Sequence, residues 1–273
     1  MVVFPNAKIN LGLFITEKRP DGFHNIETAF FPVKGFTDVL EVIENTDSSN
    51  DGLSTSGIPT DAKPEDNLVI KALKLLRNDH QIPSLKIHLH KAIPSGAGLG
   101  GGSSDAAFML NLLNQQFKLG ISTEDLEKKA AKLGADCAFF IRNTPTIATG
   151  IGNEFQPVTR KPSKTWIELI IPPIHLSTPE AYQNIKPQKP YIHLDKILTK
   201  DPEIWKDELI NDFEENAFTK HTELRSIKEM FYNKGAFYSA MSGSGSAVFG
   251  LFRKQPEIEW PEKYITWSGE IEV

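Results

Sequence analysis

Five of the eleven residues from Pro94 to Ser104 are glycine, and two serines close the run. Upstream, residues 85–90 alternate apolar and polar side chains, which predicts a strand. Downstream, residues 106–117 carry apolar side chains at helical spacing. A strand, a glycine loop and a helix start in this order predict an anion cradle. A backbone without Cβ atoms can turn its N–H groups inward, and a helix N-terminus carries partial positive charge. The expected ligand is the phosphate tail of a nucleotide.

Three kinds of phosphate loop can be compared with this run. A Walker loop ends in Gly-Lys-Ser/Thr, whereas Gly102-Ser103 occupies that place here and the lysine is missing. The dinucleotide pattern G-x-G-x-x-G is satisfied by residues 96–101, but it requires an acidic residue at a strand end about 20 positions later. The acids in that region follow Ser122 with capping-box spacing and therefore indicate a helix start. A glycine-rich surface turn is the plain alternative, although such turns rarely need five glycines before a Ser-Ser helix start.

The whole loop resembles the ATP loop of the GHMP small-molecule kinases, a superfamily named for galactokinase, homoserine, mevalonate and phosphomevalonate kinases. Further blocks resemble motifs of the same superfamily and follow its order along the chain. These blocks are Ala7–Leu11, Arg19–His24, Glu65–Leu68, Leu133–Asp136, Asn211–Glu214 and Met241–Gly245. Together they are specific, whereas any one of them alone is a weak signal.

The resemblance implies an α+β fold in two domains. The first, residues 1–157, would be an α/β domain that is similar to ribosomal protein S5 domain 2 and carries the ATP loop and catalytic residues. The second, residues 158–273, would be a ferredoxin-like α+β domain. A length of 273 residues agrees with two domains, and the prolines and basic residues between Phe155 and Ser163 interrupt the pattern where the change is expected.

Composition narrows the class of protein. The net charge of −5 argues against a nucleic-acid binder, because phosphate backbones are held by clustered Lys and Arg. The single cysteine, Cys137, excludes an internal disulfide framework and suits a reducing compartment. The N-terminus has no signal-peptide pattern, and no stretch reaches the ~20 apolar residues that span a bilayer. We therefore expect a soluble cytoplasmic protein without a membrane partner, as a monomer or homodimer.

Periodicity and turn residues predict the main elements. Strands are expected at Lys8–Thr16, Thr37–Ile43, Trp166–Ile171, Phe237–Ala240 and Ala247–Phe252. Helices are expected at Asn67–Asn78, with Asp66 as its cap and Leu68, Ala72, Leu75 and Leu76 facing inward, after Ser122, and at Glu215–Asn233. Polar connectors are expected at Asp47–Gly57 and Pro187–Pro190.

Two residues are candidates for catalysis, Asp136 and Lys8. Considered alone, Asp136 is more readily a helix cap, because Gly134 suits the left-handed position that ends a helix. Lys8, in a predicted strand, would alone be a solvent-facing charge. The resemblance implies otherwise. It assigns Asp136 the role of accepting the proton of the attacking hydroxyl or orienting that hydroxyl, with Lys8 beside it to keep the carboxylate charged.

The resemblance also implies the ligands. The activity would be ATP-dependent phosphorylation of the 2-hydroxyl of 4-diphosphocytidyl-2-C-methyl-D-erythritol, in the non-mevalonate route to isopentenyl diphosphate. The substrate-binding residues would be Asn10, Phe23, His24 and Tyr182. An aromatic ring can stack on the base, and a histidine can bond its polar edge. Phe23 departs from the tyrosine usual in the family, so stacking is kept and a phenolic hydroxyl is lost.

The expected cofactors are ATP and Mg²⁺. The residues expected to bind ATP are Asn67, Pro94, Ser95, Gly96, Ala97, Gly98, Leu99, Gly100, Gly101, Gly102, Ser103 and Ser104. No metal-ligand set is expected from the side chains, because the lone cysteine and the scattered histidines lack ligand spacing. The alternatives are another GHMP kinase of homoserine or mevalonate type and a non-catalytic nucleotide-binding regulator. A nicotinamide oxidoreductase is a more distant third.

Overall fold

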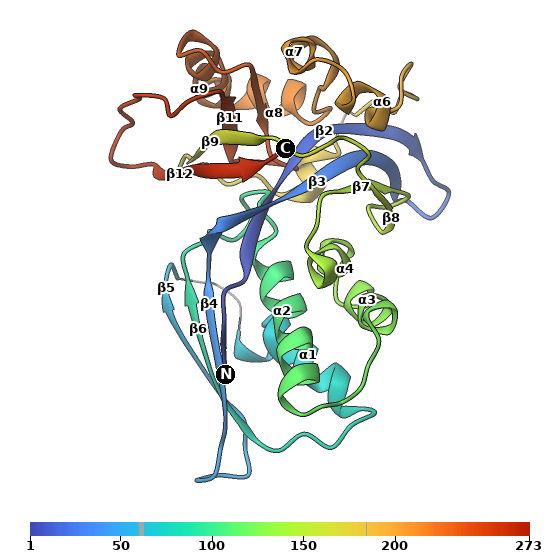
Figure 1. Cartoon of the computed structure of the whole chain (residues 1–273), viewed down its shortest axis with the longest axis vertical. Coiled ribbons are helices and arrows are strands. Elements are labelled where there is room, and N and C mark those ends of the chain that lie inside the picture. Colours follow the sequence, from blue (N-terminus) through green and yellow to red (C-terminus); the bar gives the residue numbers. More distant parts are fainter. Residues whose placement is uncertain (60–62, 184) are drawn as a thin grey trace. The chain divides into compact units, whose positions relative to one another are not determined.

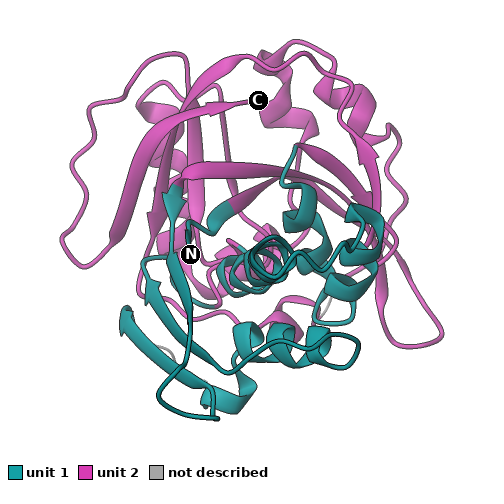
Figure 2. Ribbon diagram, turned by 60° about the horizontal axis from the view of Figure 1, so that its bottom comes forward, with its two compact units in different colours: residues 1–7, 36–95, 100–144 teal, residues 8–35, 96–99, 145–273 magenta. Residues whose placement is uncertain are grey.

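The computed structural model describes residues 1–59, 63–183 and 185–273. They divide into two compact units, coloured separately in Figure 2. Unit 1 comprises residues 1–7, 36–95 and 100–144. Unit 2 comprises residues 8–35, 96–99 and 145–273. The predicted sequence domains, 1–157 and 158–273, remain a prediction.

Unit 1 is built on a four-stranded sheet in the order β1-β4-β6-β5. Its strands are β1 (Val2–Val3), β4 (Val39–Glu44), β5 (Gly52–Gly57) and β6 (Leu85–Lys91). The predicted alternation of the strand before the glycine loop is confirmed, because Leu85, Ile87 and Leu89 are buried while intervening polar residues are more exposed. The connector predicted at 47–57 was wrong over its second half, which forms β5 parallel to β6.

The described residues of unit 1 also form four helices, and Figure 1 shows α1 and α2 alongside the sheet. They are α1 (Leu68–Arg77), α2 (Gly101–Gln116), α3 (Thr123–Ala131) and α4 (Ala135–Arg142), preceded by the 3₁₀ turn η1 (Pro64–Asp66). The apolar stripe predicted for α2 is confirmed by the burial of Ala106, Ala107, Leu110 and Leu113. The predicted cap of α3 is also confirmed, since the Ser122 hydroxyl accepts the Asp125 N–H.

The start of α1 corrects the sequence expectation. Its cap is Asn67, whose side-chain oxygen accepts the Val69 N–H at 2.9 Å, while Asp66 ends the preceding 3₁₀ turn. The buried face consists of Val69, Ala72, Leu73 and Leu76. Leu68 and Leu75, which were predicted to face inward, are only half-buried.

Unit 2 contains two four-stranded sheets. The first has the order β2-β3-β7-β8, with β2 (Asn6–Lys18), β3 (His24–Thr37), β7 (Thr146–Thr149) and β8 (Glu154–Pro157). The strand predicted at Lys8–Thr16 is confirmed within β2. The one predicted at Thr37–Ile43 is divided at Asp38, because β3 ends just before this residue and β4 begins just after it.

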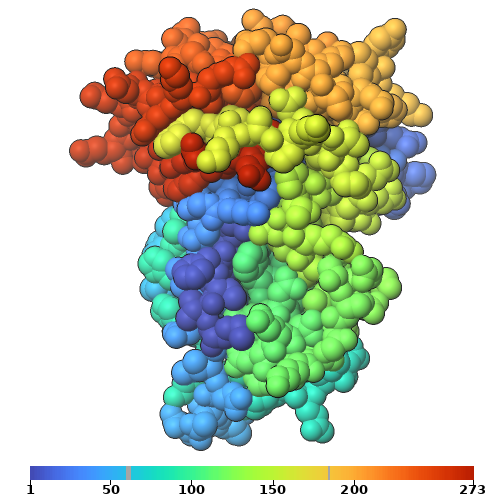
Figure 3. Space-filling model, viewed as in Figure 1, coloured from blue at the N-terminus to red at the C-terminus, as the bar shows by residue number. Residues whose placement is uncertain are grey.

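The second sheet consists of β9 (Lys164–Ile171), β10 (Tyr238–Met241), β11 (Val248–Phe252) and β12 (Ile265–Glu272). Its order is β10-β11-β9-β12, and every neighbouring pair is antiparallel. This is the ferredoxin-like order of strands, but residues 253–264 connect the last two without a helix. Strand β12 was missed in the sequence because most of its residues are exposed. The C-terminal segment, red in Figure 3, accordingly contributes to the surface shown there.

The helices of unit 2 are α5 (Thr178–Ala181), α6 (Leu194–Leu198), α7 (Trp205–Glu208), α8 (Glu214–Lys220) and α9 (Thr222–Asn233), with the 3₁₀ turn η2 (Pro202–Ile204). The single helix predicted at Glu215–Asn233 was wrong, because non-helical backbone at His221, with φ of −131° and ψ of 83°, divides it. This break allows Phe218 from α8 and Leu224 and Phe231 from α9 to enter one core. No helix in the described parts of either unit has the length and apolar character needed to cross a membrane.

Candidate active site

The glycine loop has the backbone of an anion cradle. Gly96, Gly98 and Gly100 all have left-handed conformations, with φ of +71°, +76° and +70°, which L side chains rarely adopt. Helix α2 begins directly after Gly100, and its first intrahelical bond runs from the Ser104 N–H to the Gly100 carbonyl at 2.9 Å. The N–H groups of residues 101–103 precede that bond and have no partner four residues earlier in the helix. They are suited to bind an anion.

Within unit 2, residues 96–99 of this loop contact a second glycine loop, Met241–Gly245. The Ser242 hydroxyl donates to the Gly98 carbonyl at 2.9 Å, and the Ala247 N–H donates to the Ala97 carbonyl at 3.1 Å. A Cβ on Gly98 would lie 1.9 Å from the Ser242 carbonyl oxygen, so only glycine fits there. The sequence motif thus has a steric reason as well as a conformational one.

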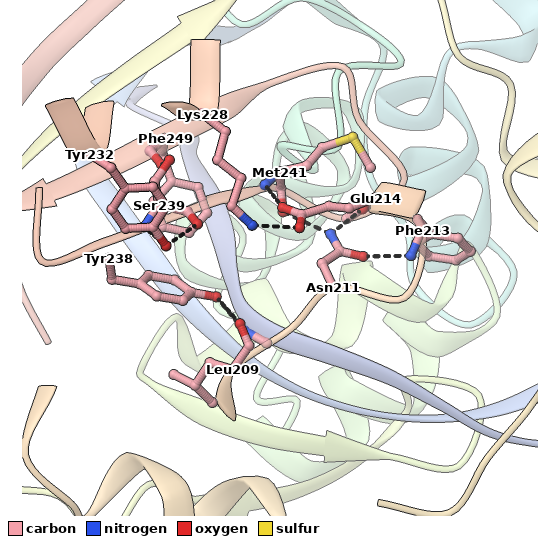
Figure 4. A network of polar contacts seen from close by, with 12 residues as sticks. Leu209, Asn211, Phe213, Glu214, Lys228, Tyr232, Tyr238, Ser239, Met241 and Phe249 are labelled. Atoms are coloured by element: carbon pink, nitrogen blue, oxygen red, sulfur yellow. Dashed lines mark hydrogen bonds and ion pairs between the residues drawn. The ribbon is translucent and has the colours of Figure 1, made fainter. Parts of the chain in front are cut away.

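The Asn211–Glu214 motif holds the second glycine loop, as Figure 4 shows. The Asn211 amide donates to the carbonyls of Met241, at 2.8 Å, and Gly243, at 2.9 Å. Glu214 accepts the Met241 N–H at 2.7 Å and pairs with Lys228 at 2.6 Å. The sequence indicated this motif but not its role, because the backbone groups that it holds lie 27 to 32 residues away in the chain.

Lys8 is buried, which corrects the solvent-facing position expected from strand alternation alone. Its ammonium donates to Asn10 Oδ1 at 2.6 Å and lies 5.0 Å from the centre of the Phe30 ring. Asn10 in turn donates to Thr28 Oγ1 at 2.9 Å, and Thr28 donates to the Gly12 carbonyl at 2.6 Å. A buried charge is costly unless it has partners, so this chain of polar groups marks Lys8 as a functional candidate. Sequence reasoning had not identified Thr28.

Asp136 is the second residue of α4 and half-buried. The expectation that it caps the helix was wrong, because the cap position is occupied by Gly134. Gly134 is itself extended, with φ of 169°, rather than left-handed as expected. A carboxylate in a first helical turn is stabilised by the helix dipole. Lys8 belongs to unit 2 and Asp136 to unit 1, and their pairing stays a prediction.

Two of the four predicted substrate residues form an aromatic pair. The rings of His24 and Tyr182 stack with their centres 4.7 Å apart, and the Phe213 ring meets Tyr182 edge-on at 4.9 Å. Burial lowers the pKa of His24, and the charge of Lys18 lowers it further, so the ring is neutral near pH 7. Phe23 is 60% exposed, and its ring surface is therefore available to a ligand.

The remaining ATP candidates belong to unit 1. Asn67 caps α1, and its predicted contact with adenine stays a prediction. The Ser103 hydroxyl and the Cys137 thiol form a hydrogen bond. Burial raises the pKa of this thiol to about 11, so little of the reactive thiolate is present near pH 7. The Ser104 hydroxyl is buried and has no hydrogen-bond partner among the described residues. No group of three or more His, Cys, Asp or Glu side chains in the described chain could hold a metal ion.

A cavity of about 940 Å³ in unit 2 does not coincide with these residues. Its lining includes Phe14, Ile185, Tyr191, Ile197 and Asp212, and none of the residues predicted to bind ATP or substrate. Burial raises the pKa of Asp212, although a bond from the Ile15 N–H acts in the opposite direction. The size of a cavity does not by itself identify an active site. The candidate site residues therefore remain those of the glycine loops and the polar groups described above.

Comparison with known proteins adds independent findings. The model described as the GHMP kinases N terminal domain matches residues 67–144, and the one described as GHMP kinases C terminal matches residues 194–259. A 4-diphosphocytidyl-2-C-methyl-D-erythritol kinase of Bacteroides thetaiotaomicron is 48% identical over 275 residues, covering 99% of this chain and 100% of that protein. One from Porphyromonas gingivalis is 50% identical, covering 95% and 94%.

Solved structures agree with the sequence matches. A crystal structure of 4-(cytidine 5'-diphospho)-2C-methyl-D-erythritol kinase superposes with a TM-score of 0.81 at 30% identity, covering all of both chains. A mevalonate kinase superposes with a TM-score of 0.70 at 11% identity, covering 100% and 99%, which shows a shared fold only. The predicted α+β GHMP-kinase fold is thereby confirmed.

Proposed function

Because the chain belongs to the 4-diphosphocytidyl-2-C-methyl-D-erythritol kinase family of the GHMP kinases, we propose that it phosphorylates that compound with ATP. The γ-phosphoryl group passes to the 2-hydroxyl and gives the 2-phosphate and ADP, in the non-mevalonate route to isopentenyl diphosphate. The observation that carries the proposal is the cradle of three left-handed glycines leading into α2. The N–H groups of this cradle are suited to the negatively charged oxygens of a triphosphate.

The loop from Pro94 to Ser104 is the proposed ATP site. The N–H groups at the start of α2 bind phosphate oxygens, and the helix dipole favours their negative charge. Gly98 has no room for a side chain, so the backbone in this part of the loop keeps one shape before ATP arrives. Asn67 is proposed to contact the adenine.

Lys8 and Asp136 are the proposed catalytic residues. The acceptor hydroxyl oxygen forms a bond to the γ-phosphorus while the bond from that phosphorus to the β–γ bridging oxygen breaks. The hydroxyl proton passes to Asp136, or Asp136 orients the hydroxyl and solvent takes the proton. Lys8, held by Asn10, stabilises the negative charge on the transferring group.

Mg²⁺ is proposed to arrive bound to ATP. In phosphoryl-transfer sites Mg²⁺ keeps several waters and is bound by substrate phosphates together with one or two carboxylates. When bound, the ion neutralises charge on the β- and γ-phosphates.

The cytidine base is proposed to bind at Phe23, His24 and Tyr182. The stacked pair of His24 and Tyr182 offers aromatic surface, and a neutral imidazole can donate or accept one hydrogen bond at the polar edge of the base. Asn10 is proposed to contact the acceptor in addition to holding Lys8. We further propose a cytoplasmic location, a monomer or homodimer, and sequence domains at 1–157 and 158–273.

The direct test is ADP release from Mg-ATP by the purified protein. The acceptors are 4-diphosphocytidyl-2-C-methyl-D-erythritol and, in parallel, mevalonate, homoserine and galactose. Turnover with the cytidyl compound alone is expected. Turnover with another acceptor instead would keep the ATP loop and refute the cytidine pocket. ATP binding without turnover of any acceptor would refute the catalytic proposal and favour a nucleotide-binding regulator.

A further inference from the structure

Three charged side chains meet in the interior of unit 1. Asp38 lies between β3 and β4, Lys91 is the last residue of β6, and Asp105 is in the second turn of α2. Their side chains are 0%, 2% and 4% exposed. Lys91 donates to Asp38 and, at 2.6 Å, to Asp105 Oδ2. We call these three residues the buried triad.

Asp38 fixes the chain where it enters the glycine loop. Its Oδ1 accepts the N–H groups of Ala92, at 2.6 Å, and Ile93, at 2.9 Å. These are the two residues between the end of β6 and Pro94. The side chain therefore holds the last backbone donors before the loop.

Lys91 and Asp105 fix the chain where it leaves the loop. A Cβ on Gly101 would lie 2.9 Å from Ile93 Cγ2 and 3.4 Å from Lys91 Nζ, so the first residue of α2 packs directly on the residues that Asp38 holds. The bond from Lys91 to Asp105 then ties the body of the helix to the end of β6. Both ends of the loop are joined through one ammonium group.

Stability alone does not explain such a cluster. Three buried ionisable groups carry a desolvation cost, and replacing a buried ion pair with apolar side chains often leaves stability unchanged or raises it. Asp105 Oδ1 is buried and has no hydrogen-bond partner among the described residues, so the cluster is not even fully satisfied. Because the arrangement costs stability and joins the two ends of the glycine loop, we look for its role in the shape of that loop.

We propose that the buried triad is a set of positioning residues for ATP: it holds the entry and exit of the glycine loop at a fixed separation, so that the N–H groups at the start of α2 meet the phosphates. This inference rests on the proposed ATP site. It assigns the triad no contact with substrate. Loss of the triad should therefore weaken the binding of ATP and leave the affinity for the cytidyl substrate unchanged.

The test compares dissociation constants of the wild type and variants for Mg-ATP and, separately, for 4-diphosphocytidyl-2-C-methyl-D-erythritol by calorimetry. Asp105→Leu removes the bond to Lys91 and should weaken the binding of ATP by roughly 10-fold to 100-fold, on the scale known for residues that orient the ligands of a metal site without touching the metal. Asp105→Asn keeps an acceptor for Lys91 and should bind ATP within about threefold of wild type. Neither variant should change the affinity for the cytidyl substrate.

Asp51→Leu is the matched control at the opposite end of β6. Asp51 accepts the Leu85 N–H at 2.9 Å and pairs with Arg77, so its loss removes a similar set of contacts from the same sheet. It should lower the melting temperature without a selective loss of ATP. The proposal would be overturned if Asp51→Leu and Asp105→Leu weakened the binding of ATP equally. It would also be overturned if a folded Asp105→Leu variant bound ATP as tightly as the wild type.

If Asp105→Leu does not fold, the triple variant Asp38→Asn/Lys91→Met/Asp105→Leu decides by the same criterion, because it leaves no unpaired charge in the interior and keeps a side-chain oxygen for the N–H groups of Ala92 and Ile93. Weakened ATP with unchanged cytidyl binding supports the triad, and unchanged ATP refutes it. Failure of wild-type protein to bind ATP at all would refute the proposed ATP site itself. That result is distinguishable from a positioning failure, which appears only in the variants.

Discussion

Single side chains carry the proposed chemistry, and Asp136 is the one whose loss can be measured most directly. Asp136→Asn keeps the size of the side chain and removes its ability to accept a proton. We expect kcat to fall by ~10²–10⁴-fold, while ATP affinity stays near the wild-type value because the cradle is untouched. Steady-state kinetics with saturating cytidyl substrate measures kcat, and calorimetry measures the affinity for ATP. Near-normal turnover would remove Asp136 from the mechanism.

Phe23 offers a test of the base pocket that is separable from folding. Because its side chain is 60% exposed, Phe23→Ala should hardly change the melting temperature. If the ring stacks on cytosine, the KM for the cytidyl substrate should rise by the equivalent of ~1–3 kcal/mol, the scale of base–aromatic stacking. Tyr191→Ala is the control, since Tyr191 is a fully exposed aromatic residue outside the proposed site. Equal effects of the two substitutions would contradict the assignment.

The sequence predicted the environment of some single residues correctly and that of others wrongly. Periodicity identified the buried face of α2 because a helix repeats its environment every three to four residues. It placed Lys8 in solvent, since alternation assumes that one face of a strand is open, whereas β2 is buried on both faces from Asn6 to Ile15. The partners of Asn10 and Asn211 could not be predicted, because they are fixed by tertiary contacts that leave no local pattern.

At the scale of elements, the two glycine loops act as one packed unit, and Gly98 is where they meet. Gly98→Ala puts a Cβ into the Ser242 carbonyl and also forces a left-handed alanine. Gly120→Ala forces a left-handed alanine too, with φ near +70°, but no atom lies within 4 Å of its Cβ. Gly120→Ala, the control, should therefore lower the free energy of unfolding only by the backbone strain, about 1–2 kcal/mol. Gly98→Ala should lower it clearly more. Urea unfolding measures both.

ATP binding gives the second readout for Gly98. The substitution should abolish or strongly weaken ATP binding, because the loop can accommodate the new Cβ only by leaving its bonded position against Ser242. Gly120→Ala should bind ATP normally. Similar unfolding free energies for the two variants would show that the close approach is not a constraint.

The elements that the sequence predicted best are those with strong local signals. The cap at Ser122 and the alternation of β6 were read correctly because each depends on neighbours within a few residues. The division of the helix at His221 was not predicted, because it follows from packing two helices into one core. Strand β12 was not predicted either, because most of its residues are exposed. The α+β class came from motif resemblance rather than from periodicity.

At the scale of the whole molecule, the buried triad predicts how stability depends on pH. Burial raises the pKa of Asp105 to about 7; the Lys91 charge opposes this, and Asp38 adds to it. Because this pKa is higher in the folded chain than in the unfolded one, folding favours the protonated form. The contribution of Asp105 to stability is therefore greatest below about pH 4, falls as pH rises toward 7, and is constant above that.

Asp105→Asn isolates this effect, because an amide does not titrate. Relative to wild type, the variant should become more stable as pH rises from about 5 to 7, by at most ~1.4 kcal/mol per pH unit, with no further change at pH 8. Urea unfolding of both proteins across this range gives the difference at each pH. A difference that does not change with pH would show that Asp105 keeps one charge state throughout.

The contact between Ser242 and Gly98 spans 144 positions of the chain, and Ala247 reaches back to Ala97 in the same way. A ribosome releases the chain from its N-terminus, so residues 96–99 emerge long before the residues that pack on them. Unit 2 closes around this segment only when the chain has been synthesised as far as residue 247, which is 150 positions after Ala97. A growing chain thus carries its most recognisable motif through this whole interval without the later residues that pack on it.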